Sequence, residues 1–164
     1  MNHALAPLSD RYWRMLGVRW QHRPFESGSH LTGGRWNPVG TPALYLSQSH
    51  HTAIVEMHQN LVRPGTLVAF DVEADAIADL RGEDASLTHG LWRDQAMLRG
   101  EVPESWRLAE RLIAEGAQGA LIPSVLDPAG TNLVLWCWYR EGEAGEGASL
   151  TLIDPEAVLS DDKR

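Results

Sequence analysis

TGGRWNPVGTPALYLSQSHHTAIVE, at residues 32–56, is the stretch that most constrains how this chain folds. It opens with Gly33 and Gly34, which lack side chains and therefore let the backbone adopt conformations closed to other residues, or approach a ligand closely. Prolines and a glycine then mark a turn, and a short apolar run after the turn predicts a strand. A serine ahead of the next amphipathic run predicts the start of a helix. A loop, a strand and a helix therefore follow one another within one short stretch.

Three polar side chains lie on these three consecutive elements. Arg35 belongs to the loop, Tyr45 to the strand predicted at residues 43–46, and Glu56 to the helix that Ser49 is predicted to cap. Because the elements are adjacent in the chain, short connections bring their side chains toward one cleft. We therefore treat the three as candidate site residues. The plainer alternatives are a salt-bridged loop arginine, a core tyrosine and a solvated glutamate.

The predicted helix has the clearest amphipathic pattern in the chain. At about 100° per residue, four apolar side chains share one arc of about 100°: Ala53, Ile54, Met57 and Leu61. Such an arc predicts a stripe that faces the core. Glu56 falls about 60° outside the arc in the same projection. It is therefore predicted to reach the wall of a cleft without being buried in the core.

The remainder of the chain contains several further strands and few helices. Strands are predicted at residues 11–20, 66–74, 119–125, 131–140 and 149–153, and further helices at 75–80 and 103–116. Residues 1–10 predict a loose start, and residues 142–147 a hairpin-like connection. Because Pro123 interrupts strand pairing, the chain is expected to kink there and present Ser124 at the strand end. Strands outnumber helices without regular alternation, which predicts the α+β class, with mixed or antiparallel sheets and flanking helices.

Length and composition point to a single domain over residues 1–164. A chain of 164 residues with 43% hydrophobic residues can bury a core without metal or disulfide support. The single cysteine, Cys137, excludes an internal disulfide and fits a reducing compartment. The N-terminus shows no signal pattern, and the longest apolar run, at residues 133–139, is too short to cross a bilayer. We therefore expect a cytoplasmic protein that does not enter a membrane.

The net charge of −8 argues against a general nucleic-acid binder, which needs a basic face. The charge is unevenly distributed, because residues 10–35 hold five arginines against the two acids Asp10 and Glu26. The planar fork of arginine suits bidentate contact with carboxylate or phosphate. An arginine-rich segment beside a glycine pair therefore suggests a small anionic ligand. Surface ion pairs with the acidic half of the chain are the alternative.

Several common functional motifs are absent around the candidate residues. The glycine pair has neither the GxGxxG pattern nor a P-loop, and Ser124 lies in no GxSxG elbow. His50, His51 and His58 share the predicted helix but lack the HExxH spacing of a zinc site. We therefore predict no dinucleotide-binding Rossmann unit, no serine hydrolase and no metal centre.

Taken together, the motifs resemble the RES domain. The resemblance rests on GGRWNPVG at residues 33–40, ALYLS at 43–47, the Ala53-x-x-Glu56 pattern, and IPSV at 122–125 followed by Asn132-Leu133. It spans roughly residues 12–153, and GGRWN followed by the tyrosine strand is its most specific part. The family is named for an arginine, a glutamate and a serine, which match Arg35, Glu56 and Ser124.

RES proteins are typically toxins of bacterial toxin–antitoxin pairs, with an Xre-type antitoxin as partner and a fold similar to ADP-ribosyltransferase toxins. Members degrade NAD+ by hydrolysis or phosphorolysis, or modify a protein with ADP-ribose. The resemblance thus implies NAD+ as substrate and no metal. Carried over by motif, it implies a catalytic set of Arg35, Tyr45, Glu56 and Ser124, and an NAD+-binding set of Arg14, Arg35, Tyr45, Ser124 and Asn132.

The residue types of this implied site fit cleavage of the nicotinamide–ribose bond. The bond breaks through an oxocarbenium-like state, which a carboxylate such as Glu56 stabilises. Under the resemblance, Arg35 and Arg14 would bind the pyrophosphate through charge-assisted contacts. Tyr45 would line the nicotinamide site, and Ser124 would orient ribose or nicotinamide. Nicotinamide leaves as a neutral molecule, so no strong general acid is required.

Three functions are compatible with the sequence. The leading hypothesis is a toxin that depletes NAD+ by hydrolysis or phosphorolysis. An ADP-ribosyltransferase that modifies a host protein is the first alternative, since it needs the same NAD+ site. A non-catalytic binding module on the same fold is the second. The oligomeric state stays open, a homo-oligomer included.

Overall fold

The computed structural model describes residues 3–59 and 61–159 as one α+β unit, which confirms the predicted class. Its strands are β1 (Leu5–Gly17), β2 (Leu44–Ser47), β3 (Gly65–Asp79), β4 (Gly119–Pro123), β5 (Thr131–Leu135), β6 (Trp138–Arg140) and β7 (Ala148–Leu152). Its α-helices are α1 (Ser29–Thr32), α2 (His50–His58) and α3 (Glu104–Ala114), with shorter helical segments at Val18–Trp20, Glu83–His89 and Asp94–Leu98. Within the described residues, no helix has the length and apolar character needed to cross a membrane.

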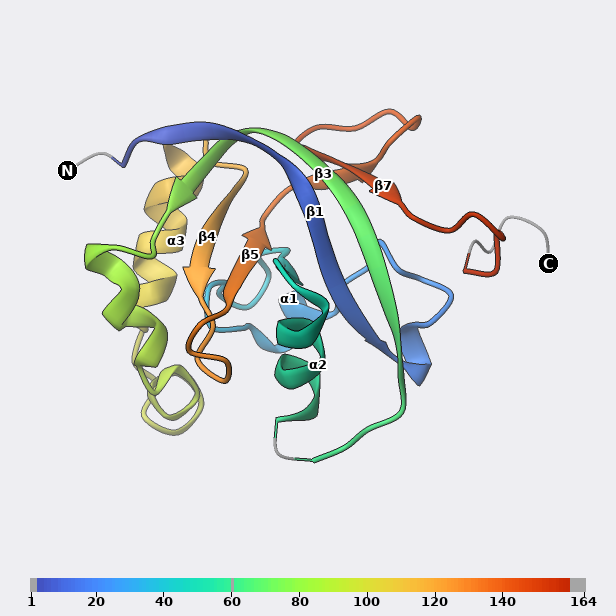
Figure 1. The fold of residues 1–164 in the computed structure, drawn as a ribbon. Coiled ribbons are helices and arrows are strands. Elements are labelled where there is room, and N and C mark those ends of the chain that lie inside the picture. Colours follow the sequence, from blue (N-terminus) through green and yellow to red (C-terminus); the bar gives the residue numbers. More distant parts are fainter. Residues whose placement is uncertain (1–2, 60, 160–164) are drawn as a thin grey trace.

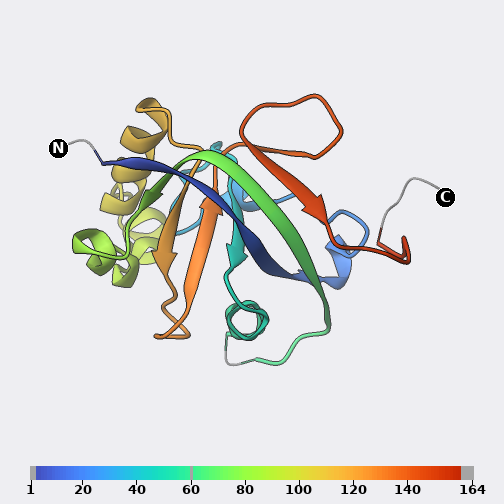
Figure 2. The ribbon, with the colours of Figure 1, turned by 45° about the horizontal axis from the view of Figure 1, so that its top comes forward.

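The strands form a mixed sheet that closes on itself. Their order is β1-β2-β5-β4-β3-β7-β6, and β1 also pairs with β3, so β1, β2, β5, β4 and β3 form a closed circuit. Figure 1 shows β1 and β3 as a long pair that arches across the molecule, with α3 beside β4. In Figure 2, α2 is seen end-on between the β4–β5 turn and the β1–β3 pair. Helix α2 therefore lies at one end of this closed circuit of strands, near the β4–β5 turn.

Strands β1 and β3 are longer than the sequence pattern indicated. The predicted loose start at residues 1–10 is wrong from Leu5 onward, and the predicted helix at residues 75–80 is also wrong. The two segments pair with each other, Leu5 lying opposite Ala78, and this end of β3 also pairs with β4. Their backbone groups thus find partners far away in the chain. A local pattern carries no information about such partners.

The segment at residues 131–140, predicted as one strand, is divided into β5 and β6. Strand β5 ends at Leu135, and Trp136 then turns inward, where its indole Nε1 donates a 3.0 Å hydrogen bond to the Trp36 carbonyl. Strand β6 pairs with β7 in parallel orientation. Residues 142–147 therefore cross over and do not form the predicted hairpin-like connection.

Helix α2 begins as predicted, because Ser49 Oγ accepts a 3.1 Å hydrogen bond from the Thr52 amide. A cap of this kind contributes about 1 kcal/mol. The helix ends at His58, since Gln59 adopts a left-handed conformation with φ of 42°. Leu61, predicted on the core-facing stripe, therefore lies beyond the helix and is 61% exposed.

Two buried apolar clusters support the elements around the candidate site. One lies between the strands and includes Tyr12, Phe70 and Leu133. The other contains Trp36 together with Leu108 and Leu112 of α3. The Trp36 side chain is fully buried, and burying an aromatic side chain contributes about 2–3 kcal/mol. This anchor fixes the loop that precedes β2.

Candidate active site

Glu56 is held at one carboxylate oxygen by two side chains from the region of β4 and β5. Its Oε1 accepts a 2.5 Å hydrogen bond from Ser124 Oγ and a 2.9 Å hydrogen bond from Asn132 Nδ2. Its Oε2 has no hydrogen-bond partner within the described part of the chain. Hydrogen bonds to an ionised carboxylate are stronger than those between neutral groups. The carboxylate is therefore fixed through one oxygen while the other stays available.

Asn132 is itself oriented by a hydrogen bond across the sheet. Ser47 lies opposite Asn132 in the register of β2 and β5, and Ser47 Oγ donates to Asn132 Oδ1 at 2.7 Å. Because the amide oxygen is turned to Ser47, the amide nitrogen must face Glu56. Asn132, predicted to bind NAD+, thus contacts the candidate catalytic carboxylate directly.

Arg35 enters the site from the loop before β2, with its backbone and side chain both held. Ser105 Oγ of α3 donates to the Arg35 carbonyl at 2.5 Å, and Arg35 Nη1 donates to the Gly90 carbonyl at 2.7 Å. No ion pair involves Arg35 among the described residues. Burial lowers the pKa of Arg35, while Glu56 opposes this shift and Arg93 adds to it. A guanidinium with unused donors and no carboxylate in contact is suited to bind an anion.

The glycine pair before Arg35 is required by packing within the protein. Gly33 has a positive φ of 79°, and a Cβ there would lie 2.9 Å from the Trp106 ring. A Cβ on Gly34 would lie 2.5 Å from Asn37 Oδ1 and 2.7 Å from the Tyr45 hydroxyl. Trp106 Nε1 also donates a 2.7 Å hydrogen bond to the Gly34 carbonyl. The loop therefore keeps its course only without side chains at these two positions.

Gly34→Ala is expected to lower the midpoint of thermal unfolding by roughly 4–8 °C. The added methyl group would overlap two polar atoms, and overpacking of this kind costs about 2 kcal/mol, where 1 kcal/mol corresponds to about 2–4 °C in a domain of this size. Gly17→Ala is the matched control, because Gly17 has extended backbone and its Cβ would lie 3.6 Å from the nearest side chain. Circular dichroism melting curves measure both variants. Equal midpoints would contradict the packing role of Gly34.

Tyr45 uses its hydroxyl to organise the same loop. The hydroxyl donates to Asn37 Oδ1 at 2.7 Å and accepts from the Trp36 amide at 3.0 Å. Asn37 Nδ2 in turn donates to the carbonyls of Ser29 and Thr41. Burial raises the pKa of Tyr45 well above its usual value, so the phenol is neutral at physiological pH. Only the ring is left to contact a ligand, and its predicted place beside nicotinamide stays a prediction.

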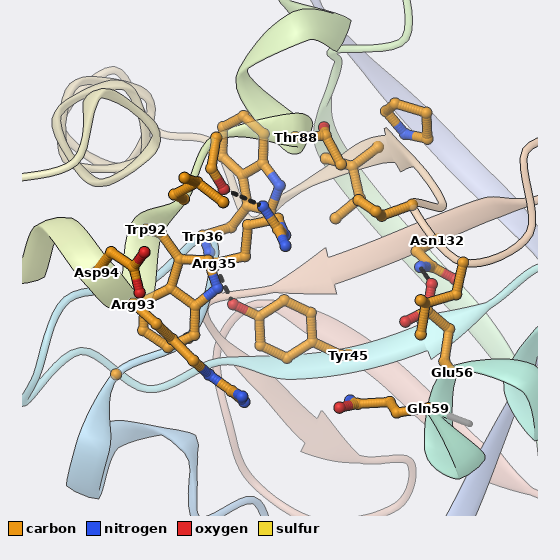
Figure 3. A pocket seen from close by; sticks show the side chains of 18 residues that line it. Arg35, Trp36, Tyr45, Glu56, Gln59, Thr88, Trp92, Arg93, Asp94 and Asn132 are labelled. Atoms are coloured by element: carbon orange, nitrogen blue, oxygen red, sulfur yellow. Dashed lines mark hydrogen bonds between the residues drawn. The ribbon is translucent and has the colours of Figure 1, made fainter. Parts of the chain in front are cut away.

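Four of the predicted site residues line one cavity of about 460 Å³: Arg35, Tyr45, Glu56 and Asn132. Figure 3 shows Glu56 and Asn132 on one side of this cavity and Arg35 on the other, with the ring of Tyr45 between them. Ser124 is 2% exposed and is not among the lining residues; it reaches the site through its hydrogen bond to Glu56. Its predicted contact with the substrate stays a prediction.

The cavity wall also holds Arg93, an arginine that no sequence pattern marked. Arg93 lies on the same side of the cavity as Arg35 in Figure 3, and its guanidinium carbon is 5.3 Å from the centre of the Trp92 ring. Residues 81–103 have mixed polarity without a regular period, so no pattern marked this segment as part of a site. The cavity lining thus has two arginines and two carboxylates, with Asp94 next to Arg93 and Glu56 on the opposite side.

Two buried polar atoms of cavity-lining residues lack a partner. Trp36 Nε1 and Thr88 Oγ1 make no hydrogen bond within the described chain. Buried polar groups almost always have a partner, so a ligand or an ordered water is expected to supply one here. The described residues contain no group of three or more His, Cys, Asp or Glu side chains placed to hold a metal ion.

Arg14 lies outside this cavity, in an adjoining hollow of about 320 Å³ whose wall also includes Glu56 and Asn132. Its Nη1 donates to the carbonyls of Pro24 and Glu26, at 2.8 Å and 2.7 Å. Burial lowers the pKa of Arg14 to about 10. Arg14 therefore fixes the loop after β1. Its predicted contact with pyrophosphate stays a prediction.

The fold and the grouped arginine, glutamate and serine define the class of this protein. The chain matches the RES domain family over residues 11–149 and belongs to that family.

Among characterised relatives, Toxin Res of Yersinia enterocolitica is 29% identical over 119 residues, which are 66% of this chain and 70% of that protein. Among solved structures, the chain is similar to the crystal structure of the M. tuberculosis MbcT–MbcA toxin–antitoxin complex, with a TM-score of 0.56 and 24% identity. This similarity covers 80% of the present chain and 75% of the other. The similarity shows that the two proteins share a fold.

Proposed function

We propose that this protein is the toxin of a toxin–antitoxin pair and depletes NAD+ by cleaving the bond between nicotinamide and ribose. The observation that carries the proposal is the placement of Glu56 opposite Arg35 across one cavity, with Arg93 on the same side as Arg35. NAD+ has an anionic pyrophosphate and a ribose that becomes cationic when nicotinamide leaves. Arginines suit the first group and a carboxylate suits the second. Membership of the RES family and the relative named Toxin Res support the toxin role.

In this proposal Glu56 stabilises the positive charge that develops on the ribose. Both electrons of the broken bond leave with nicotinamide, which departs as a neutral molecule. The ribose carbon then bonds to an oxygen of water, with release of a proton, or to an oxygen of inorganic phosphate. Ser124 and Asn132 hold the carboxylate beforehand, so no reorganisation is needed as the charge appears.

Incubation of the purified protein with NAD+ tests this function. We expect free nicotinamide to accumulate, with ADP-ribose in plain buffer for hydrolysis, or its anomeric phosphate in phosphate buffer for phosphorolysis. If nicotinamide is released only when a protein acceptor is present, and mass spectrometry finds ADP-ribose on that acceptor, the protein is instead an ADP-ribosyltransferase. No NAD+ consumption under any of these conditions would contradict the proposal and favour a binding module.

The antitoxin of this proposal is a protein that covers the mouth of the cavity. Leu91 and Leu126 line the cavity and are 65% and 39% exposed. Exposed apolar side chains gathered around a polar site are typical of protein interaction surfaces. The similar M. tuberculosis structure is a toxin–antitoxin complex. We therefore expect the product of a neighbouring gene, of the Xre type, to bind here.

Leu91→Glu is expected to weaken the complex with this antitoxin by at least about tenfold, because it places a charge in an apolar contact. Val158→Glu is the matched control, since Val158 is 58% exposed but does not line the cavity. The antitoxin is co-purified with the protein and then separated from it. Titration calorimetry measures its affinity for each of the two variants. The wild-type complex should also release nicotinamide more slowly than the free protein. Equal affinities for the two variants would place the antitoxin elsewhere.

A further inference from the structure

Thr52 and Asp127 join the helix that carries Glu56 to the turn that carries Ser124. Thr52 Oγ1 donates a 2.7 Å hydrogen bond to Asp127 Oδ2. Thr52 precedes Glu56 by four positions in α2, so the two side chains lie on the same face of the helix. Figures 1 and 2 both show α2 beside the turn between β4 and β5. The helix and the turn at residues 124–130 are therefore joined at two points, one helical turn apart.

Asp127 also determines how the Ser124 hydroxyl is used. The backbone N–H of Asp127 donates to Ser124 Oγ at 3.0 Å, and the turn is closed by a 3.0 Å bond from the Ser124 amide to the Gly130 carbonyl. A hydroxyl that accepts a hydrogen bond on one side has its proton free to point to the other. That proton is directed to Glu56 Oε1, 2.5 Å away. The hydrogen bond from Ser124 to the Glu56 carboxylate thus depends on the position of Asp127.

The contact between helix and turn is closely fitted. Thr52 is 1% exposed, and Ser49 Oγ lies 2.9 Å from Thr52 Oγ1 while accepting the Thr52 amide. A Cβ on Gly130 would lie 2.6 Å from Thr52 Oγ1, so the turn comes as near as a glycine allows. The Asp127 carboxylate meets the first turn of α2, where the helix dipole favours negative charge.

We propose that Thr52 and Asp127 are positioning residues that keep the Ser124 proton on Glu56 and hold the catalytic carboxylate at the cavity. The assignment rests on the proposed function, because it concerns the reaction at Glu56. Neither Thr52 nor Asp127 is among the residues that line the cavity, so the pair acts through Ser124 and Glu56 and not on the substrate. Without their hydrogen bond, the turn moves from the helix and Glu56 loses a fixed donor.

Thr52→Val keeps the shape of the side chain and removes its hydroxyl, whereas Thr52→Ser keeps the hydroxyl. We expect Thr52→Val to lower kcat for nicotinamide release about tenfold with less than about twofold change in KM, and Thr52→Ser to stay within about twofold of wild type. Asp127→Ala removes the same hydrogen bond at its partly exposed partner, and its kcat and KM are expected to match those of Thr52→Val. It serves as the test variant if Thr52→Val does not fold. Thr151→Val, at an exposed position of β7, is the control and should leave kcat unchanged.

A double-mutant cycle tests whether the pair acts through Ser124. In a Ser124→Ala background, Thr52→Val is expected to lower kcat no further, because the group that it positions is already absent. A second loss of about tenfold in that background would overturn the inference, because Thr52 would then act independently of Ser124.

Amide hydrogen exchange of Asp127, followed by NMR, gives a measurement that does not depend on activity. We expect exchange to be at least about tenfold faster in Thr52→Val and unchanged in Thr52→Ser, since the Asp127 amide is the donor to Ser124. Unchanged exchange in Thr52→Val would overturn the positioning role. A wild-type protein that releases no nicotinamide would instead overturn the proposed function, and the exchange rates alone would then decide whether the pair holds the turn.

Discussion

Glu56→Gln is expected to lower kcat for nicotinamide release by about a hundredfold or more, with little change in KM. In the proposed reaction the carboxylate stabilises a cation that appears mainly in the transition state, so the loss of its charge falls on kcat. Glutamine keeps an oxygen at the position of Oε1, which still accepts the hydrogen bonds from Ser124 and Asn132. The packing around the side chain is therefore retained while its charge is removed.

Glu110→Gln is the matched control for this variant, because Glu110 is exposed on α3 and loses the same charge. Initial rates of NAD+ consumption measure kcat and KM for both proteins, and circular dichroism confirms that both are folded. A folded Glu56→Gln protein with a kcat near that of wild type would show that Glu56 is not the catalytic carboxylate.

The elements that flank the site were predictable because their signals are local. A serine followed by an amphipathic run marked the start of α2, and Ser49 does accept the hydrogen bond expected of a cap. Pro123 marked the end of β4, and Ser124 follows that strand directly. Pro103 and Gly116 marked the limits of α3, which begins at the next residue after the proline. In each case a single residue fixes backbone geometry or supplies a hydrogen bond without help from distant parts of the chain.

The long-range pairing could not be predicted in the same way. The first residues of β1 contain Pro7 and carry no alternating pattern, yet they pair with the end of β3. The break between β5 and β6 depends on Trp136, whose indole bonds to the carbonyl of Trp36, 100 positions away. Tertiary contacts of this kind override local propensity, because packing and pairing with distant segments decide what a half-buried segment becomes.

At the site, the residue types were predictable and their partners were not. Arg35, Glu56 and Ser124 matched a family pattern, but that pattern does not show that the serine hydroxyl is directed to the glutamate. The place of Thr52 near the site could have been predicted from the sequence, because it lies one helical turn before Glu56 on the same face of the helix. The place of Arg93 could not have been predicted, because its segment has no regular period and reaches the cavity only through the tertiary fold.

Arg35→Ala is expected to raise KM for NAD+ by about tenfold to a hundredfold, with a smaller fall in kcat. In the proposed reaction, Arg35 contacts the pyrophosphate both before and during bond cleavage, so loss of this contact weakens binding in the ground state and in the transition state alike. A charge-assisted hydrogen bond contributes about 1.5–3 kcal/mol, and each 1.4 kcal/mol is about a factor of ten. The bond from Ser105 reaches the Arg35 carbonyl, so the loop keeps this anchor in the variant.

Arg35→Lys separates charge from geometry, because lysine keeps the positive charge but lacks the planar fork. In the proposed complex this fork would bond to the Gly90 carbonyl and to a phosphate at the same time. Its KM should therefore lie between wild type and Arg35→Ala. Arg111→Ala, at an exposed position of α3, removes the same charge away from the cavity and should leave KM unchanged. Added salt should raise KM of wild type more than that of Arg35→Ala, since it screens a contact that the variant lacks. An Arg35→Ala protein with KM within about twofold of wild type and a reduced kcat would mean that Arg35 acts in the transition state and not in substrate binding.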